Sequence, residues 1–270
     1  MGGKSKMKRI FENNGINFSN KGKYQLHVGS EGINYESSNG KKSLSIKFAD
    51  VGSIVILRYL NSNSHYTLIF RNYDGKNMEE IDTDVENVLY KFNNMFETKS
   101  ILIAFAENKL TEAFPDNLDT LNLQIGFSLK EKEIRLKEGV IVGVKHQVKL
   151  SNIRRVKCAS NGTLSNLLIY QKEKGGFLFD KPDMKIPLNE LTLPIFEAIM
   201  AKNNGKGIDF SMGNGFDQKT SEYIIERYMN STFFMNADGS VTDDWHRIAY
   251  EHIAAYKSDV EIPENIVFLE

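Results

Sequence analysis

Two histidines and a glutamate near the C-terminus are the first residues whose types could hold a metal ion. They are His246, Glu251 and His252, and all three fall on one helix predicted from about residue 243 to residue 257. At 100° per residue, His246 lies about 120° from His252, and Glu251 lies about 100° away on the other side. Because helical ligand pairs need i, i+4 spacing, we expect no shared metal ion.

Three other patterns fall short of known sites. If Gly239 took the sixth position of a calcium loop, Phe234 and Trp245 would take the first and twelfth, and neither binds calcium. The stretch 213–215, Gly-Asn-Gly, lacks the preceding strand and the lysine of a phosphate loop. Cys158 has no histidine near it, and no Gly-x-Ser-x-Gly elbow occurs. We therefore predict no catalytic residue, metal or cofactor, and no enzyme; a site between domains stays open as an alternative.

One cysteine in 270 residues allows no internal disulfide, which favours a reducing, cytoplasmic location. The longest apolar run, Ile101 to Ala106, is far shorter than the roughly 20 residues that span a bilayer. We expect a soluble protein that is not integral to a membrane.

Charge is unevenly distributed along the chain. Residues 1–115 hold 15 Lys or Arg and 13 Asp or Glu, residues 116–208 hold 15 and 10, and residues 209–270 hold 4 and 12. Either the basic middle and the acidic end pack together, or the acidic end blocks a basic surface, or both regions are merely solvated.

The strongest local run of positive charge lies between residues 145 and 157, which include no acidic residue. Its five cationic residues form a candidate basic surface: Lys145, Lys149, Arg154, Arg155 and Lys157. Such a surface suits an acidic protein, including this chain's own C-terminal region, or the phosphates of nucleic acid and anionic membrane. Aromatic residues are not interleaved as base stacking requires, which favours the acidic protein.

The C-terminal region is dense in aromatic residues. Five of them form a candidate partner surface: Tyr223, Tyr228, Phe233, Phe234 and Trp245. Because Tyr and Trp often anchor interfaces, this predicts a protein partner or self-association. The alternative is that they form the core of a helical hairpin, with helices near residues 218–229 and 243–257.

Short segments separated by turn residues predict an antiparallel meander in the first part of the chain. The expected strands are residues 24–28, 33–36, 44–48, 53–59 and 66–71. Thr83 and Glu86 form a capping-box pattern, which predicts that a helix begins there. Its expected apolar face is Val88, Leu89, Phe92, Met95 and Phe96.

The same order returns from about Leu121. The expected strands are residues 121–129, 133–137, 140–150, 153–158, 167–171 and 177–179, followed by a helix over 192–202. Thr192 is the expected N-cap of that helix, with Pro194 in its first turn. The residue types at positions 47–51 are similar to those at 149–153, and those at 66–70 are similar to those at 166–170.

Antiparallel strands followed by one C-terminal amphipathic helix resemble the pleckstrin-homology-like (PH-like) fold, a bent barrel plugged by its helix. The resemblance covers about residues 23–98 and 121–202, and tandem units of this kind look like those of bacterial PH-like proteins. It implies a binding scaffold rather than an active site. Phosphoinositide binding by such domains needs a basic first hairpin. Ser30-Glu31-Gly32 has no basic residue, and the cations at 130–137 alternate with acids, so no specific phosphoinositide site is expected.

The predicted fold is therefore mainly β with α: an N-terminal segment (1–20), two PH-like domains (21–115 and 116–208) and an acidic helical region (209–270). The leading functional hypothesis is a non-enzymatic, intracellular scaffold that binds a protein partner or a second copy of itself. The alternative is peripheral binding to anionic membrane or nucleic acid through the basic second unit.

Overall fold

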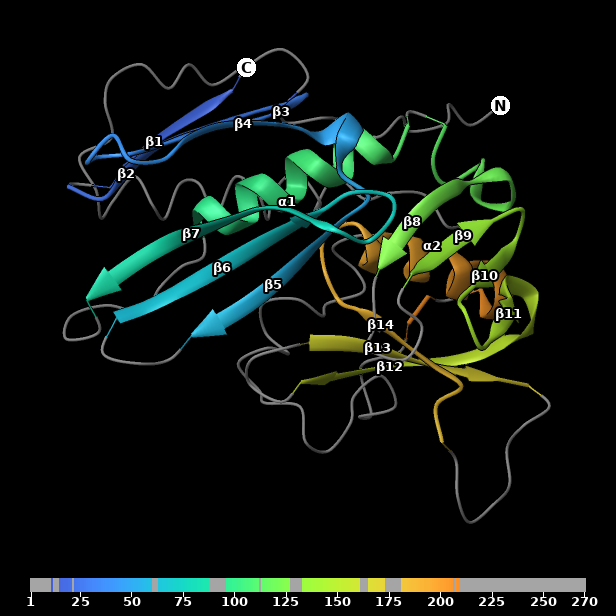
Figure 1. Cartoon of the computed structure of the whole chain (residues 1–270). Helices are drawn as coiled ribbons and strands as arrows, with labels where there is room; N and C mark the ends of the chain where they lie inside the picture. Colours follow the sequence, from blue (N-terminus) through green and yellow to red (C-terminus); the bar gives the residue numbers. More distant parts are fainter. Residues whose placement is uncertain are drawn as a thin grey trace.

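The computed structural model describes residues 11, 15–20, 22–59, 63–87, 96–111, 113–126, 133–160, 165–172, 181–205 and 207–208. These residues form a mainly β structure of four antiparallel sheets with two α-helices (Figure 1). The predicted C-terminal helical hairpin lies outside the described residues.

The first half contains a four-stranded and a three-stranded sheet, followed by a helix. The first sheet has the order β1 (Ile16–Asn20), β2 (Tyr24–Gly29), β3 (Gly32–Ser37) and β4 (Ser43–Lys47). The second has the order β5 (Ser53–Tyr59), β6 (Asn63–Arg71) and β7 (Asn77–Asn87), and helix α1 (Phe96–Lys109) follows. All five strands predicted here are confirmed. The sequence pattern missed β1 and β7.

The second half repeats this order. Its four-stranded sheet contains β8 (Asn122–Gly126), β9 (Ile134–Lys137), β10 (Val140–Val142) and β11 (Gln147–Lys149). Its three-stranded sheet contains β12 (Ile153–Ser160), β13 (Ser165–Gln171) and β14 (Met184–Pro187), and helix α2 (Thr192–Asn204) follows. The segment predicted over 140–150 is two strands, β14 was missed, and the strand predicted at 177–179 lies outside the described residues.

The same corner joins the two sheets in each half. A 3₁₀ turn, η1 (Phe48–Asp50) or η3 (Leu150–Asn152), leads from the four-stranded sheet to the three-stranded one. The Phe48 N–H donates to the Glu31 carbonyl between β2 and β3, and the Leu150 N–H donates to the Gly139 carbonyl between β9 and β10 (both 2.9 Å). The predicted match of residues 47–51 with 149–153 is thus confirmed.

The end of each helix is tied to this corner. The Lys109 ammonium of α1 donates to the Phe48 carbonyl at 2.7 Å. The Asn203 amide of α2 donates to the carbonyls of Leu150 at 2.9 Å and Ile153 at 2.8 Å. Since the Phe48 and Leu150 carbonyls close the 3₁₀ turns, each helix is attached to the corner between the two sheets of its half.

The predicted match of residues 66–70 with residues 166–170 is shifted by one residue. Phe70 belongs to the hydrophobic core, whereas Tyr170 lies on the opposite face of its strand, next to two arginines. Side chains alternate between the faces of a strand, so a shift of one residue exchanges core and surface.

The helix predicted to begin at Thr83 is wrong, because Thr83 lies within β7 and α1 begins at Phe96. The residues of its expected apolar face from 88 to 95 lie outside the described residues. The apolar run 101–106 instead lies in α1 and is buried on all sides, as expected for a helix enclosed by other elements. Figure 1 shows α1 between the sheets β1–β4 and β5–β7.

A reciprocal pair of carboxylates connects β7 to the start of α1. The backbone N–H groups of Glu97 (3.3 Å) and Thr98 (2.9 Å) donate to the Asp84 carboxylate, and the Asp84 N–H donates to the Glu97 carboxylate at 2.7 Å. Asp84 has φ of 52°, a left-handed conformation that Asp tolerates better than most residues. The Tyr24 hydroxyl also donates to Glu97. Burial, with the nearby Glu97 charge, raises the pKa of Tyr24 well above its ordinary value.

Helix α2 is capped by Asn189 rather than by Thr192. The Asn189 side-chain oxygen accepts the N–H groups of Leu191 (3.0 Å) and Thr192 (2.9 Å). The Thr192 hydroxyl is used differently, donating to the Pro187 carbonyl at 2.7 Å. The prediction of Thr192 as the N-cap was therefore wrong, because Thr192 lies within the helix and its own N–H is bonded to the Asn189 side chain.

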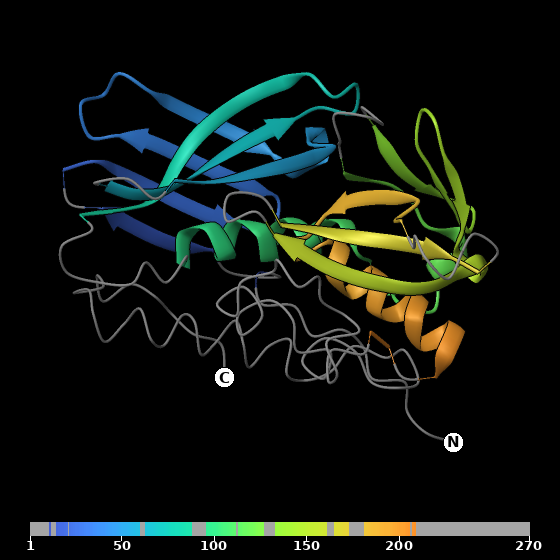
Figure 2. The ribbon, with the colours of Figure 1, turned by 90° about the horizontal axis from the view of Figure 1, so that it is seen from below.

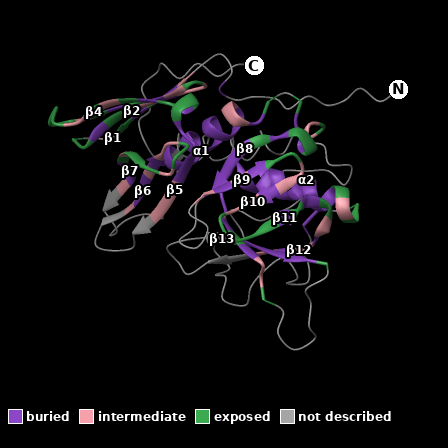
Figure 3. Cartoon of the chain, turned by 45° about the vertical axis from the view of Figure 1, so that its right-hand side comes forward, coloured by how far each residue is buried: buried purple, intermediate pink, exposed green. Residues whose placement is uncertain are grey.

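The two halves share one hydrophobic core. Apolar residues of all four sheets and both helices belong to a single buried cluster, and β5 contacts β8 where the halves meet. Figure 2 shows α1 and α2 on the same side of the molecule, and Figure 3 shows α2 almost wholly buried.

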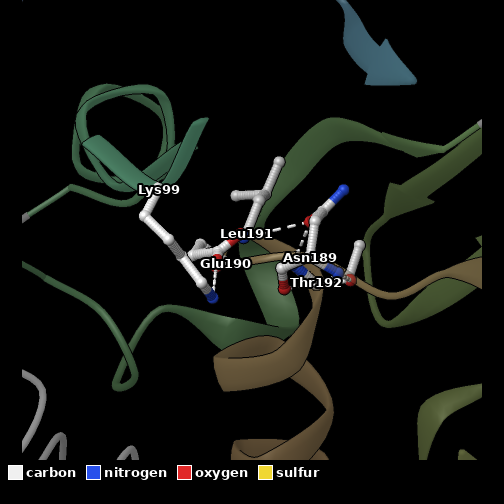
Figure 4. Close-up of polar contacts among 5 residues, drawn as sticks. All are labelled: Lys99, Asn189, Glu190, Leu191 and Thr192. Atoms are coloured by element: carbon white, nitrogen blue, oxygen red, sulfur yellow. Dashed lines mark hydrogen bonds and ion pairs between the residues drawn. The ribbon is translucent and has the colours of Figure 1, made fainter. Parts of the chain in front are cut away.

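A buried ion pair also joins the halves (Figure 4). The Lys99 ammonium, in the first turns of α1, contacts the Glu190 carboxylate directly before α2. Their side chains are 6% and 4% exposed. A pair desolvated to this extent is costly to break, because removal of one partner leaves an uncompensated charge in the interior.

We predict that Lys99→Met lowers the free energy of unfolding by about 3–5 kcal/mol, because Glu190 loses its counter-ion. Lys202→Met is the matched control, since the Lys202–Asp119 pair is 56% and 62% exposed and its loss costs less than about 1 kcal/mol. Urea unfolding at pH 7 measures both. Equal losses in the two variants would contradict the prediction. The double variant Lys99→Met/Glu190→Met is expected to recover part of the loss.

Candidate functional site

The structure divides the candidate basic surface between two sheets. Lys145 lies in the turn between β10 and β11, and Lys149 lies in β11. Arg154, Arg155 and Lys157 lie in β12, beyond the η3 corner. The five residues therefore do not form one row, although they are close in sequence.

Two of the arginines flank one tyrosine of the neighbouring strand. A register shift between Ile153 and Arg155 interrupts the pairing of β12 with β13, and Arg155 pairs with Tyr170. The guanidinium carbons of Arg154 and Arg155 lie 5.6 Å and 4.4 Å from the centre of the Tyr170 ring. The Arg154 Nε also donates to the Gln171 carbonyl at 2.7 Å. Cation–π attraction therefore orients both guanidinium groups, and the hydrogen bond also holds that of Arg154.

A second row of cations crosses the same sheet. Lys157 of β12 pairs with Leu168 of β13, which pairs with Lys185 of β14. Directly opposed residues of antiparallel strands point to the same face, so the two lysines flank Leu168 on one face of the sheet. Lys185 is exposed, whereas its neighbour Met184 is buried on the other side of the strand.

We call this outer side of the sheet β12–β14 the cationic face, formed by Arg154, Arg155, Lys157 and Lys185. Leu168 and Tyr170 are each only 4% exposed, although they lie opposite the core-facing side. The long apolar stems of Lys and Arg commonly cover such side chains while their charges stay in water. Asp183 adjoins this sheet, and its carboxylate accepts the Gln171 N–H at 2.9 Å.

Sequence reasoning missed Lys185 and Tyr170. Both join the cationic face through strand register, which the local sequence pattern does not show. The candidate partner surface, Tyr223, Tyr228, Phe233, Phe234 and Trp245, lies outside the described residues, as do the two histidines near the C-terminus.

Neither a metal-binding cluster nor a membrane-spanning helix is found in the part of the chain that the structure describes. Within those residues, no group of three His, Cys, Asp or Glu side chains could hold a metal ion. None of the helices described is long and apolar enough to cross a membrane.

One buried carboxyl group was not anticipated from the sequence. Glu197 of α2 is fully buried, and burial raises its pKa to about 8. One of its oxygens accepts the Ile208 N–H at 2.9 Å, and the other has no hydrogen-bonding partner among the described residues. Gly207 has φ of 83°, and a Cβ there would lie 2.6 Å from the carboxylate. The group thus fixes the chain directly after α2.

The raised pKa of Glu197 predicts the direction of a pH effect. In the folded protein Glu197 keeps a proton that the unfolded chain releases above about pH 4.5. The contribution of Glu197 to the free energy of unfolding is therefore greatest below pH 4.5 and is lost as pH rises to about 8. Between pH 4.5 and pH 7 we expect the free energy of unfolding to fall by up to about 3 kcal/mol.

Glu197→Gln should remove this dependence, because a neutral amide keeps the acceptor for Ile208 without titrating. Urea unfolding at a series of pH values measures the effect, with exposed Glu80→Gln as the control. Parallel pH profiles for the wild type and Glu197→Gln would show that the group does not titrate as expected.

Comparison with known proteins assigns no family to the chain. No family model matches it, and no curated protein matches it.

Proposed function

We propose that this protein is a non-enzymatic, intracellular interaction protein built from two PH-like units, and that its cationic face binds an acidic segment of a partner protein. The PH-like assignment is supported by the repeated order of four strands, a 3₁₀ corner, three strands and a helix. The single cysteine supports the intracellular assignment.

The arrangement around Tyr170 carries the proposal. Arg154 and Arg155 lose little side-chain freedom on binding, because the tyrosine ring already orients both and the Gln171 carbonyl also holds Arg154. Guanidinium groups bind carboxylates in a bidentate manner, which suits an acidic peptide. Lys157 and Lys185 extend the positive charge along the sheet.

An acidic protein fits this face better than nucleic acid or membrane. Bases stack on accessible aromatic rings, whereas Tyr170 is 4% exposed. The exposed large hydrophobic residues among those described are Tyr73, Met78 and Val144, and none of them lies in β12, β13 or β14. The cationic face therefore lacks an apolar group for insertion into a bilayer. Residues 209–270, with a net charge of −8, are one acidic sequence that a second copy could supply.

We predict that Lys157→Glu/Lys185→Glu weakens binding to polyglutamate about tenfold or more, because charge repulsion replaces attraction on the face. Lys47→Glu/Lys76→Glu is the control, since it changes the net charge equally at exposed sites in the first half. Fluorescence anisotropy at several salt concentrations measures both affinities.

Equal weakening in the two variants would show that only net charge matters and would contradict the proposal. Face-dependent binding to phosphatidylserine vesicles or single-stranded DNA, without binding to polyglutamate, would favour the alternative of a membrane or nucleic-acid ligand. Sedimentation of the wild type and the Lys157→Glu/Lys185→Glu variant tests self-association through the same face.

A further inference from the structure

We propose that the outer face of the sheet β1–β4 binds a neutral oligosaccharide. Eight polar side chains from the four strands form this face, which we call the polar face. They are Asn17, Ser19, Gln25, His27, Asn34, Glu36, Ser43 and Ser45. A hollow of about 680 Å³ lies over it and is lined by residues of all four strands.

Strand register arranges these side chains in two rows. One row is Asn17, His27, Asn34 and Ser45, and the other is Ser19, Gln25, Glu36 and Ser43. Adjacent strands lie about 4.8 Å apart and alternate residues about 6.7 Å apart, so the grid measures about 14 Å by 7 Å. All eight are exposed or half-buried, while alternate residues of the strands face the core (Figure 3).

The composition of this face differs from that of an ordinary solvated sheet. Glu36 is the only carboxylate that lines the hollow, and no Lys or Arg lines it, whereas 26% of the whole chain is charged. Lys47 lies on the same side of β4, beyond Ser45 and outside the lining of the hollow. Neutral amides and hydroxyls lose their water at much lower cost than charged groups do. The polar face is therefore suited to close contact with an uncharged ligand.

One side chain of the face is already fixed. The His27 Nδ1 and the Asn17 Oδ1 are 2.7 Å apart, and the imidazole N–H donates because an amide oxygen can only accept. A Cβ on Gly15 would lie 2.2 Å from the His27 ring, so glycine lets the backbone lie against the imidazole. This orients the ring before any ligand arrives, which lowers the entropic cost of binding.

The ligand class follows from the groups present. Amides and hydroxyls both donate and accept hydrogen bonds, as sugar hydroxyls do. A phosphate-bearing or anionic ligand in the hollow would meet Glu36, and none of the residues that line the hollow is a Lys or Arg. An extended peptide usually binds a sheet at its edge, through backbone groups, rather than on its face. The hollow falls within the range of 300–1,000 Å³ that is usual for ligand sites.

The test uses the full chain labelled with ¹⁵N and titrated with cellohexaose, xylohexaose, maltohexaose and chitohexaose. Because the face has no aromatic platform, we expect dissociation constants near 1 mM. Amide shifts should cluster on residues 17–19, 25–27, 34–36 and 43–45 with at least one sugar. Gln25→Ala/Asn34→Ala should weaken that binding tenfold or more.

Asn122→Ala/Gln147→Ala is the matched control, because it removes one exposed amide from each of two strands of the other four-stranded sheet. Its affinity should equal that of the wild type. The proposal is overturned if no sugar shifts these amides at about 10 mM, if the shifts cluster elsewhere, or if only sulfated sugars bind. Polyglutamate binding tests the cationic face separately.

Discussion

The hydrogen bonds from each helix end to its 3₁₀ corner are the contacts on which the arrangement of each half depends. Lys109 binds the carbonyl of Phe48, and Asn203 binds those of Leu150 and Ile153. A helix, a four-stranded sheet and a three-stranded sheet meet at that point. With the corner fixed, the inner faces of both sheets form the core, and their outer faces are left for binding.

The buried charged groups serve the fold. Asp84 and Glu97 satisfy the backbone at the start of α1, and Lys99 with Glu190 joins the two halves. Buried ionisable residues also occur at active sites, so burial by itself does not identify function. Each of these residues already has a structural partner, and the candidate binding groups are found on the outer faces instead.

The two outer faces differ in charge although the halves share one topology. The sheet β12–β14 carries Arg and Lys around Tyr170, and the sheet β1–β4 carries small neutral groups around His27. The core restrains inward residues strongly and outward residues weakly. A repeated fold can therefore present different chemistry on its two halves, which is consistent with different ligands at the two faces.

The sequence alone determined the strands with clear alternation, the helix α2 and the repeated corner, because hydrophobic period and turn residues are local signals. It did not determine where α1 begins. Thr83 formed a plausible cap in sequence, but β7 pairs with β6 there and Asp84 caps the helix from a distance. Register and packing decided the sites as well: Lys185 and the two rows of the polar face come together only through cross-strand pairing. Such pairings depend on the exact alignment of neighbouring strands and on which of their faces packs against the core, so only the tertiary structure could set them.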